Sequence, residues 1–246
     1  MQEKAVVELG TLHFKEANEL VREALAAADL VELRNVYAQR YLGCTMPRGK
    51  RLEIHGVPGN DMACYMDGGE IEVFGNAQDQ VGNTMDNGLI VIHGRCGDAA
   101  GYAMRGGKLL IRDGCGWRVG INMKQYQDKY PWIVIGGDAG NFLGEYMAGG
   151  VIVLLGHAGE YLATGMTGGV IYLRENISPE LLPAGTTIQQ VSEEEAAELE
   201  EILSLYNHYF ASELQELGRP LAPQDARGFY ALRPKGEAPG NTTYID

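Results

Sequence analysis

The chain has 246 residues, of which 45% are hydrophobic and 22% charged, the composition of a folded protein of one or two domains. Its 33 acidic and 20 basic residues give a net charge of −13, so we expect no nucleic-acid partner and no binding to an anionic membrane surface. The sequence has neither a basic and then apolar leader nor an apolar run of about 20 residues, and we therefore expect a cytoplasmic protein outside the membrane.

An amphipathic helix is predicted near the N-terminus, over residues 12–29. Apolar side chains recur there at spacings of three and four residues, which places them on one face of a helix. They are Phe14, Ala17, Leu20, Val21, Ala24, Leu25 and Ala28. We expect residues 1–33 to form an N-terminal helical flank across one end of the molecule.

A repeat follows, between about Val36 and Glu175. Glycine is twice as frequent as usual, with 34 residues, and many of the glycines recur at a fixed period. Six methionines mark the repeat at spacings of 19, 19, 19, 24 and 19 residues: Met66, Met85, Met104, Met123, Met147 and Met166. An earlier, degenerate copy around Met46 brings the number of units to seven.

Each unit also carries two apolar residues two positions apart, such as Ile71 and Val73 or Ile90 and Ile92. Alternation with a period of two predicts a short strand with one face turned inward. A single unit cannot bury that face, but seven stacked units can. The repeat therefore predicts a β-solenoid over residues 34–176, with glycines at its corners and a narrow dry core.

The fourth unit departs from the repeat in two ways. Trp117 and Arg118 replace the usual corner Asp or Asn, and five extra residues fall within residues 124–132. Insertions in solenoids form loops on one face, often the binding face, and aromatic residues anchor interfaces. The candidate partner-contact residues are Trp117, Arg118, Tyr126, Tyr130 and Trp132. An insertion that is merely tolerated stays open as the alternative.

A second helix is predicted after the repeat. Residues 192–195, SEEE, have the form of a capping box, and an apolar stripe runs from Leu199 to Leu217 before Gly218 and Pro220 end it. We expect this helix to cover the other end of the solenoid, because open strand edges invite aggregation. Residues 177–246 would then form a C-terminal helix and, from residue 219, an extended tail.

The histidines do not predict a metal site. His55 and His93 share one position of the repeat but lie two coils apart, about 9.6 Å by strand spacing, with Phe74 between them. A zinc ion needs its nitrogen ligands about 2.0–2.1 Å away. We expect corner or surface histidines.

The four cysteines form two pairs on neighbouring units, Cys44 with Cys64 and Cys96 with Cys115. The strand spacing would permit disulfides, but side chains in a ladder point in parallel and no CxxC motif is present. We expect small buried hydrophobic residues in a reducing compartment.

Asp79 and Asp98 occupy equivalent corners of neighbouring units. Stacked carboxylates can raise one another's pKa or bind a hard cation, whereas corner Asp residues commonly accept N–H bonds of a turn. We favour the turn interpretation. The sequence thus predicts no catalytic residue, no cofactor-binding residue and no metal ligand.

The text GNAQDQVGNTMDNG at residues 75–88, with its copies, resembles the GXGXG repeat of the C-terminal β-helix domain of the glutamate synthase large (alpha) subunit. The lead-in at residues 33–43 is similar to the start of that domain. The same repeat occurs in one of the subunits of formylmethanofuran dehydrogenase and in stand-alone glutamate-synthase-like subunits. The resemblance implies a mainly β fold: a right-handed parallel β-helix of about seven coils, flanked by an N-terminal and a C-terminal α-helix.

The resemblance also implies a structural role. In glutamate synthase the glutaminase domain begins with a catalytic cysteine, and the synthase domain binds flavin and iron–sulfur clusters. This chain begins Met1-Gln2 and has no cysteine cluster, so no catalytic residue carries over. We expect a non-catalytic scaffold subunit in glutamate biosynthesis and nitrogen metabolism. It would bind no cofactor itself and would hold glutaminase-type and FMN/iron–sulfur synthase-type partner subunits.

Two alternatives stay open. One is the same scaffold role in a formylmethanofuran dehydrogenase-type complex. The other is an independent β-helix enzyme that acts on polysaccharide through an acidic groove. A solenoid with two open ends also leaves self-association into a homo-oligomer open.

Overall fold

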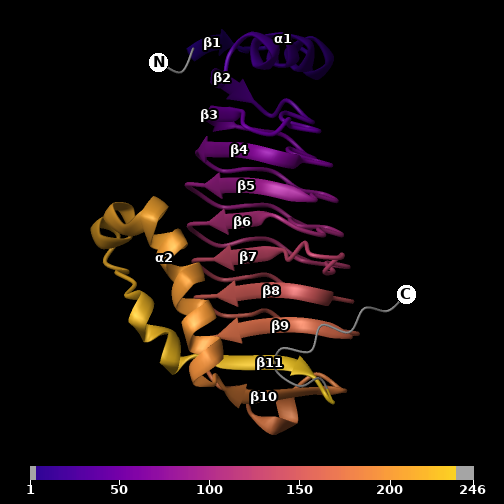
Figure 1. Cartoon of the computed structure of the whole chain (residues 1–246), viewed down its shortest axis with the longest axis vertical. Helices are drawn as coiled ribbons and strands as arrows, with labels where there is room; N and C mark the ends of the chain where they lie inside the picture. The colour runs from indigo at the N-terminus through magenta and orange to yellow at the C-terminus, as the bar shows by residue number, and fades with distance from the viewer. Residues whose placement is uncertain (1–3, 237–246) are drawn as a thin grey trace.

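The computed structural model describes residues 4–236 as a column of stacked strands, with one helix at an end and another along its side (Figure 1). Within these residues the strands form one sheet in the order β1-β2-β3-β4-β5-β6-β7-β8-β9-β11-β10. The strands are β1 (Lys4–Glu8), β2 (Leu30–Tyr37), β3 (Arg51–Val57), β4 (Asp67–Phe74), β5 (Asn87–Ile92), β6 (Lys108–Ile111), β7 (Trp132–Ile135), β8 (Ala148–Leu154), β9 (Gly168–Leu173), β10 (Thr186–Gln190) and β11 (Tyr230–Pro234). The helices are α1 (Phe14–Ala27) and α2 (Glu193–Glu216), with 3₁₀ turns at Pro179–Leu181 and Pro223–Gly228.

The repeat forms the predicted β-solenoid. From β1 to β9 each strand pairs in parallel with the next one in the chain, so equivalent residues of successive units lie above one another. Ile71, for example, pairs with Ile90, which pairs with Leu109. The insertion in the fourth unit does not shift this register, because Leu109 pairs with Ile133.

The interior of the column is filled by the repeat residues. The methionines from Met66 to Met147 are 0% exposed, as are the inward Ile and Leu side chains of the strands beside them. One continuous apolar cluster runs from Leu9 to Leu232. Burying each such side chain contributes about 1.5–3 kcal/mol, so the seven units hold one another together through a shared core.

Glycine occupies only some of the left-handed backbone positions at the corners. Gly56 has φ +130°, and a Cβ there would lie 2.4 Å from the carbonyl oxygen of Val36, so no other residue fits. Other left-handed positions carry ordinary side chains, among them Tyr65 (φ 55°) and Tyr146 (φ 53°). The stacked coils therefore impose this conformation even where the residue itself disfavours it.

Helix α1 covers the N-terminal end of the column, as predicted. Ala17, Val21 and Leu25 face the core, and the Asn18 amide donates to the carbonyl of Arg40 at 2.7 Å. Leu20, which we placed on the apolar stripe, is 40% exposed, whereas the polar Asn18 is buried on the same helix. Residues 4–8 form a strand rather than part of a helical flank, and β1 extends the parallel sheet beyond β2.

Helix α2 was expected across the C-terminal end, and this was wrong: it lies along the outer face of the sheet (Figure 1). The reason is a change in the outward residues of the strands. One outward position is acidic in β3 and β4, at Glu53 and Glu72, and becomes apolar at the paired residues from β5 onward, beginning with Val91. The apolar outward residues buried against α2 are Val91, Leu110, Trp132, Val134, Val151, Val153, Val170 and Tyr172.

The predicted limits of α2 are confirmed. The Ser192 hydroxyl accepts the N–H of Glu195, and the Glu195 carboxylate accepts the N–H of Ser192 at 2.7 Å. Gly218 adopts φ +69° just after the C-cap residue Leu217, and the N–H groups of Gly218 and Arg219 donate to the carbonyls of Gln215 and Leu214 in the last turn.

The C-terminal end of the column is closed by two antiparallel strands instead of a helix. Strand β11 pairs with β9, and β10 pairs with β11. The segment expected to be an extended tail thus contributes a strand to the sheet, while its last part, residues 237–246, lies outside the described residues. Neither helix between residues 4 and 236 is long and apolar enough to span a bilayer.

Candidate functional site

The five predicted contact residues do not form one patch. Trp117 and Arg118 lie at an exposed corner of the column, Tyr126 lies in the insertion, and Tyr130 and Trp132 pack toward helix α2. The first group joins aromatic residues of the next two coils that sequence reasoning did not select. We name Trp117, Arg118, Phe142, Tyr146 and Tyr161 the aromatic corner.

The aromatic corner is a ladder across successive coils. The Arg118 guanidinium lies over the Phe142 ring, 5.0 Å from its centroid, and that ring stacks on Tyr161 at 4.8 Å and 14°. Backbone bonds set the spacing, because Arg118 donates its N–H to Asn141 and Phe142 donates to Glu160. Stacking and a cation over a ring hold the three side chains in an ordered array.

Trp117 is the residue before Arg118 and adds a further aromatic side chain to this surface. Its side chain is 55% exposed and lies against Gly140 of the next coil, where a Cβ would come within 2.3 Å of the indole. Its backbone N–H donates to the Asp98 carboxylate at 2.8 Å. Tyr146 and Tyr161 are 55% and 59% exposed, so the corner presents three large aromatic side chains to solvent.

The insertion is a short reverse turn. Tyr126 and Lys129 exchange backbone hydrogen bonds of 3.2 and 3.0 Å, and the Lys129 ammonium pairs with Asp86 at 2.9 Å. The Tyr126 side chain points into solvent. The insertion is thus closed by its own backbone bonds, and the ion pair of Lys129 with Asp86 ties it to the column.

Trp132 lies in β7, on the outer face of the sheet beneath α2, and is 9% exposed. The Lys108 ammonium lies over its ring at 4.3 Å. Tyr130 packs at the edge of the same cluster. These two aromatic residues contribute to the contact between sheet and helix.

The corner carboxylates take the predicted turn role, with one difference: they bind the next coil rather than their own. Asp79 accepts the backbone N–H of Asp98 at 2.9 Å, and Asp98 accepts that of Trp117. Asn141 does the same for Glu160 at 3.0 Å. Each side chain thereby replaces a strand hydrogen bond at a corner, where the backbone ladder is interrupted.

The predicted histidine column is present, but His93 is not a surface residue. His55, Phe74 and His93 stack at 4.7 and 5.0 Å. The His93 ring bonds Glu72 at 2.9 Å and Glu213 of α2 at 2.8 Å. Burial lowers the pKa of His93, but the two carboxylates outweigh it and the pKa is raised overall.

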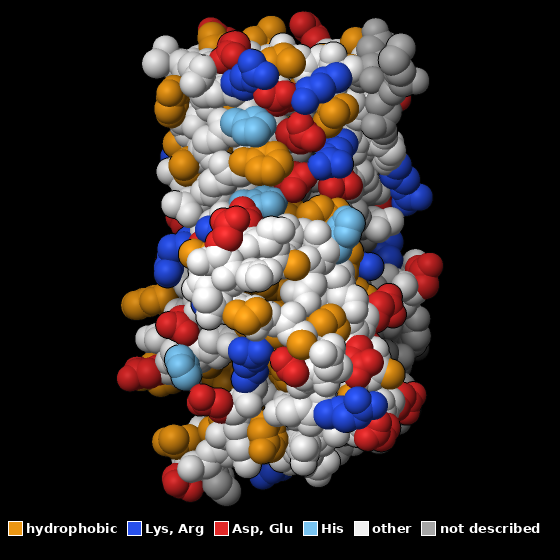
Figure 2. All heavy atoms as spheres, turned by 90° about the vertical axis from the view of Figure 1, so that its left-hand side faces the viewer, with side chains coloured by type: hydrophobic (Ala, Val, Ile, Leu, Met, Phe, Trp, Pro, Cys, Tyr) orange, Lys and Arg blue, Asp and Glu red, His pale blue; other side chains and the backbone are white. Residues whose placement is uncertain are grey.

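Above the end of α2 the face of the sheet is charged (Figure 2). Glu32, Glu53 and His55 there bring ligand atoms within 4.8 Å of one another, the spacing of a metal site. Cations already occupy both carboxylates: Lys4 pairs with Glu32 at 2.7 Å and with Glu53 at 3.4 Å, and Arg34 also binds Glu32. The bonds from Arg34 and Lys4 lower the pKa of Glu32 to about 2. The group is therefore an ion-pair cluster.

The cysteines divide into two different pairs. Cys96 and Cys115 are buried as predicted, and burial raises both pKa values, that of Cys115 to about 12. Cys44 and Cys64 instead place their sulfur atoms 2.9 Å apart. The expectation that ladder side chains point in parallel is wrong for this second pair.

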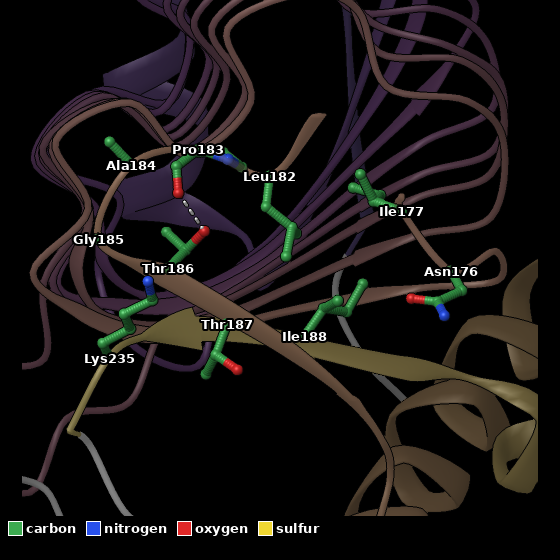
Figure 3. A pocket seen from close by; sticks show the side chains of 10 residues that line it. All are labelled: Asn176, Ile177, Leu182, Pro183, Ala184, Gly185, Thr186, Thr187, Ile188 and Lys235. Atoms are coloured by element: carbon green, nitrogen blue, oxygen red, sulfur yellow. Dashed lines mark hydrogen bonds between the residues drawn. The ribbon is translucent and has the colours of Figure 1, made fainter. Parts of the chain in front are cut away.

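A cavity of about 410 Å³ lies at the C-terminal end of the column (Figure 3). It is enclosed by the segment that follows β9 on one side and by strand β10 on the other. Ile177, Leu182 and Ile188 line it with apolar side chains, and the Thr186 hydroxyl donates to the Pro183 carbonyl at 2.8 Å. Lys235 is the titratable residue in its lining. The apolar lining continues the core rather than forming a convergent polar site.

Sequence reasoning missed Phe142, Tyr146 and Tyr161, although a signal existed. They occupy the same two positions of the repeat as Tyr41 and Tyr65, five residues and one residue before a methionine. Aligning the units by methionine would have placed all five at solvent-facing corners. Glu72 and Glu213 give no comparable signal, because they approach His93 from distant parts of the chain.

Comparison with known proteins agrees with this architecture. A family model described as GXGXG motif matches residues 28–218. An uncharacterized protein of Methanocaldococcus jannaschii is similar, with 47% identity over 157 residues. The matched region covers 62% of this chain and 60% of the length of that relative.

Proposed function

We propose, from the premise that this chain belongs to the GXGXG motif family, that it is a non-catalytic scaffold subunit of a cytoplasmic glutamate synthase-like complex. Its partners would be a glutaminase-type subunit and a synthase-type subunit that holds FMN and iron–sulfur clusters. The column would fix their relative positions and bind no cofactor itself.

The observation that carries this proposal is the filled interior. Among the described residues, side chains at 0% exposure fill the core through successive coils, and the cavity at the C-terminal end has a largely apolar wall, so the column offers mainly rigid outer faces. Enzyme sites commonly require a concave pocket with converging polar groups. A rigid column with varied side chains along its corners suits the spacing of other subunits.

The polar corner groups support the same proposal. The carboxylates of Asp79 and Asp98 are held by backbone N–H groups of the next coil, at 2.9 and 2.8 Å. A glycoside hydrolase would need a pair of carboxylates free to act as acid and base or nucleophile. The polysaccharide-enzyme alternative therefore has less support than a scaffold role.

The aromatic corner is the proposed contact surface. Trp, Tyr and Arg are the residues that most often dominate interface energies, and here they are exposed on a rigid array. Holding them in place before binding lowers the entropy lost on association. We assign this surface to partner binding.

The test is affinity purification of the tagged full chain from its native cell, with partner subunits identified and quantified by mass spectrometry. We expect glutaminase-type and flavin-type subunits in constant ratio. The double variant W117A/Y161A should weaken their retention at least about tenfold, because two interface anchors are lost. Recovery of molybdenum or tungsten subunits would instead support the formylmethanofuran dehydrogenase-type alternative.

The matched control is Y37A/Y65A, which removes two tyrosines of similar exposure near the N-terminal end. It should leave the retention unchanged. Equal retention by both double variants would contradict the assignment of the aromatic corner. A chain recovered without any partner in constant ratio would contradict the scaffold role.

A further inference from the structure

Cys44 and Cys64 lie at the same position of adjacent coils, and the Cys64 thiol donates to the Cys44 sulfur at 2.9 Å. Backbone bonds hold the two segments together, because the N–H of Thr45 donates to the Cys64 carbonyl at 2.9 Å. Both cysteines lie in turns of stacked coils, and the strand spacing of about 4.8 Å at which the coils repeat is within the Cα range that a disulfide spans. The two sulfur atoms can therefore be joined without separating the coils.

The two thiols have different environments. Cys64 is buried, whereas Cys44 is partly exposed at the surface. The hydrogen bond from Cys64 lowers the pKa of Cys44 to about 7, and the charge of Arg22 on α1 acts in the same direction. The pKa of Cys64 is raised. Cys44 thus has the accessibility and thiolate character of an attacking thiol, and Cys64 sits behind it.

The second cysteine pair lacks these features. Cys96 and Cys115 also lie on adjacent coils, but the Cys96 thiol is directed to the Gln78 carbonyl at 3.7 Å. Both side chains are buried, and burial raises both pKa values. Cys96 and Cys115 therefore serve as an internal control: they have the same spacing between coils but lack the accessible thiol.

We propose that Cys44 and Cys64 form a redox-active dithiol that reacts with small-molecule disulfides. The Cys44 thiolate attacks one sulfur of the small disulfide, its S–S bond breaks, and one thiolate leaves with the electron pair. The Cys64 thiol then loses its proton to the medium and attacks the Cys44 sulfur of the mixed disulfide, which releases the second small thiolate. The small disulfide is reduced to two thiols, and the protein dithiol is oxidised to one disulfide.

The product would join the first repeat coil to the second, beside helix α1. Closing this link restricts the unfolded chain and raises the midpoint of thermal unfolding. A reducing thiol in excess reverses the reaction. The N-terminal end of the column would thereby respond to the thiol–disulfide balance around it.

The experiment incubates the full chain with oxidised glutathione, alkylates the remaining thiols and digests the protein with trypsin. We expect a disulfide between the peptides 41–48 and 52–95, which contain Cys44 and Cys64. Dithiothreitol should remove it. The variant C64A should retain glutathione on Cys44, because the second thiol is missing, and C96S should react as the unaltered chain does.

Iodoacetamide labelling gives a second readout that needs no disulfide. At pH 7 Cys44 should be alkylated about tenfold faster in the unaltered chain than in C64A, because its thiolate is more abundant. Circular dichroism of C64A verifies that the variant is folded. The proposal is overturned if the unaltered chain yields no linked peptide pair, or if Cys96 and Cys115 become linked as readily. Equal alkylation rates in folded C64A would also overturn it.

Discussion

His93 connects the solenoid to helix α2 by charge. Its ring lies between Glu72 of β4 and Glu213 of α2, and these carboxylates also contact Arg51 and Arg112. The pKa of His93 is raised in the folded protein, so its favourable contribution is complete below the unfolded value of about 6.5. The contribution is lost as the pH rises through the folded-state pKa.

We therefore predict that the variant H93Q is less stable than the unaltered chain by on the order of 2 kcal/mol at pH 6. The difference should shrink by pH 9, because neutral His93 no longer attracts both carboxylates. Urea unfolding at the two pH values measures it. The control H157Q alters an exposed histidine and should show no such trend. A difference for H93Q that stays constant with pH would contradict the assignment.

Gly56 and Gly49 separate two roles of glycine at corners. Both have positive φ, but a Cβ on Gly56 meets the Val36 backbone, whereas one on Gly49 meets nothing within 4 Å. We predict that G49A costs about 1–2 kcal/mol, through conformational strain alone. G56A should cost about 3 kcal/mol or more, since backbone atoms of the neighbouring coil must move. Similar unfolding free energies for the two variants would contradict the close stacking of coils.

Among the secondary-structure elements, α2 shows the largest difference between the predicted and the observed position. The 19-residue period and inward Ile and Leu residues predict the coils, and the capping box predicts where α2 begins. The apolar outward residues, such as Val91 and Val153, indicate a second covered face. That signal was present in the strands but is weak in each unit alone, and it is evident only when units are compared.

The contact between α2 and the sheet gives a direct prediction. Phe210 is fully buried, and its ring meets His93 edge-on at 5.0 Å. F210A should lower the free energy of unfolding by about 3–5 kcal/mol, because it leaves a cavity between helix and sheet. L217A, at the exposed end of the same helix, should change it by less than about 0.5 kcal/mol. If F210A and L217A lowered the free energy of unfolding equally in urea, the packing of α2 against the sheet through Phe210 would be contradicted.

At the scale of the whole molecule, both ends of the sheet need protection. Helix α1 with β1 covers one end, and β11 with β10 covers the other. The first was predicted in part from the helical periodicity of residues 12–29. The second could not be predicted, because β11 is short and follows a helix, and its pairing with β9 spans a long stretch of chain. The repeat likewise does not specify the partners that we propose for the aromatic corner.

Disrupting β11 should expose the edge of β9. Ala231 lies between Tyr172 of β9 and Gln189 of β10, and proline there removes a hydrogen bond in the middle of the sheet. We predict that A231P associates at rising concentration in light scattering, because its strand edges are open. R227A, in the exposed turn before β11, should behave as the unaltered chain does. A dispersed, unchanged A231P would contradict the role of β11 in closing the column.

We propose that this chain supplies a rigid surface and that its partners supply the chemistry. The most direct measurement compares the purified full chain with the complex recovered through it, by visible absorbance and by ammonia release from glutamine. We expect flavin and iron–sulfur absorbance and glutamine hydrolysis in the complex, and neither in the chain alone. Stoichiometric flavin or glutamine turnover in the pure chain would contradict it.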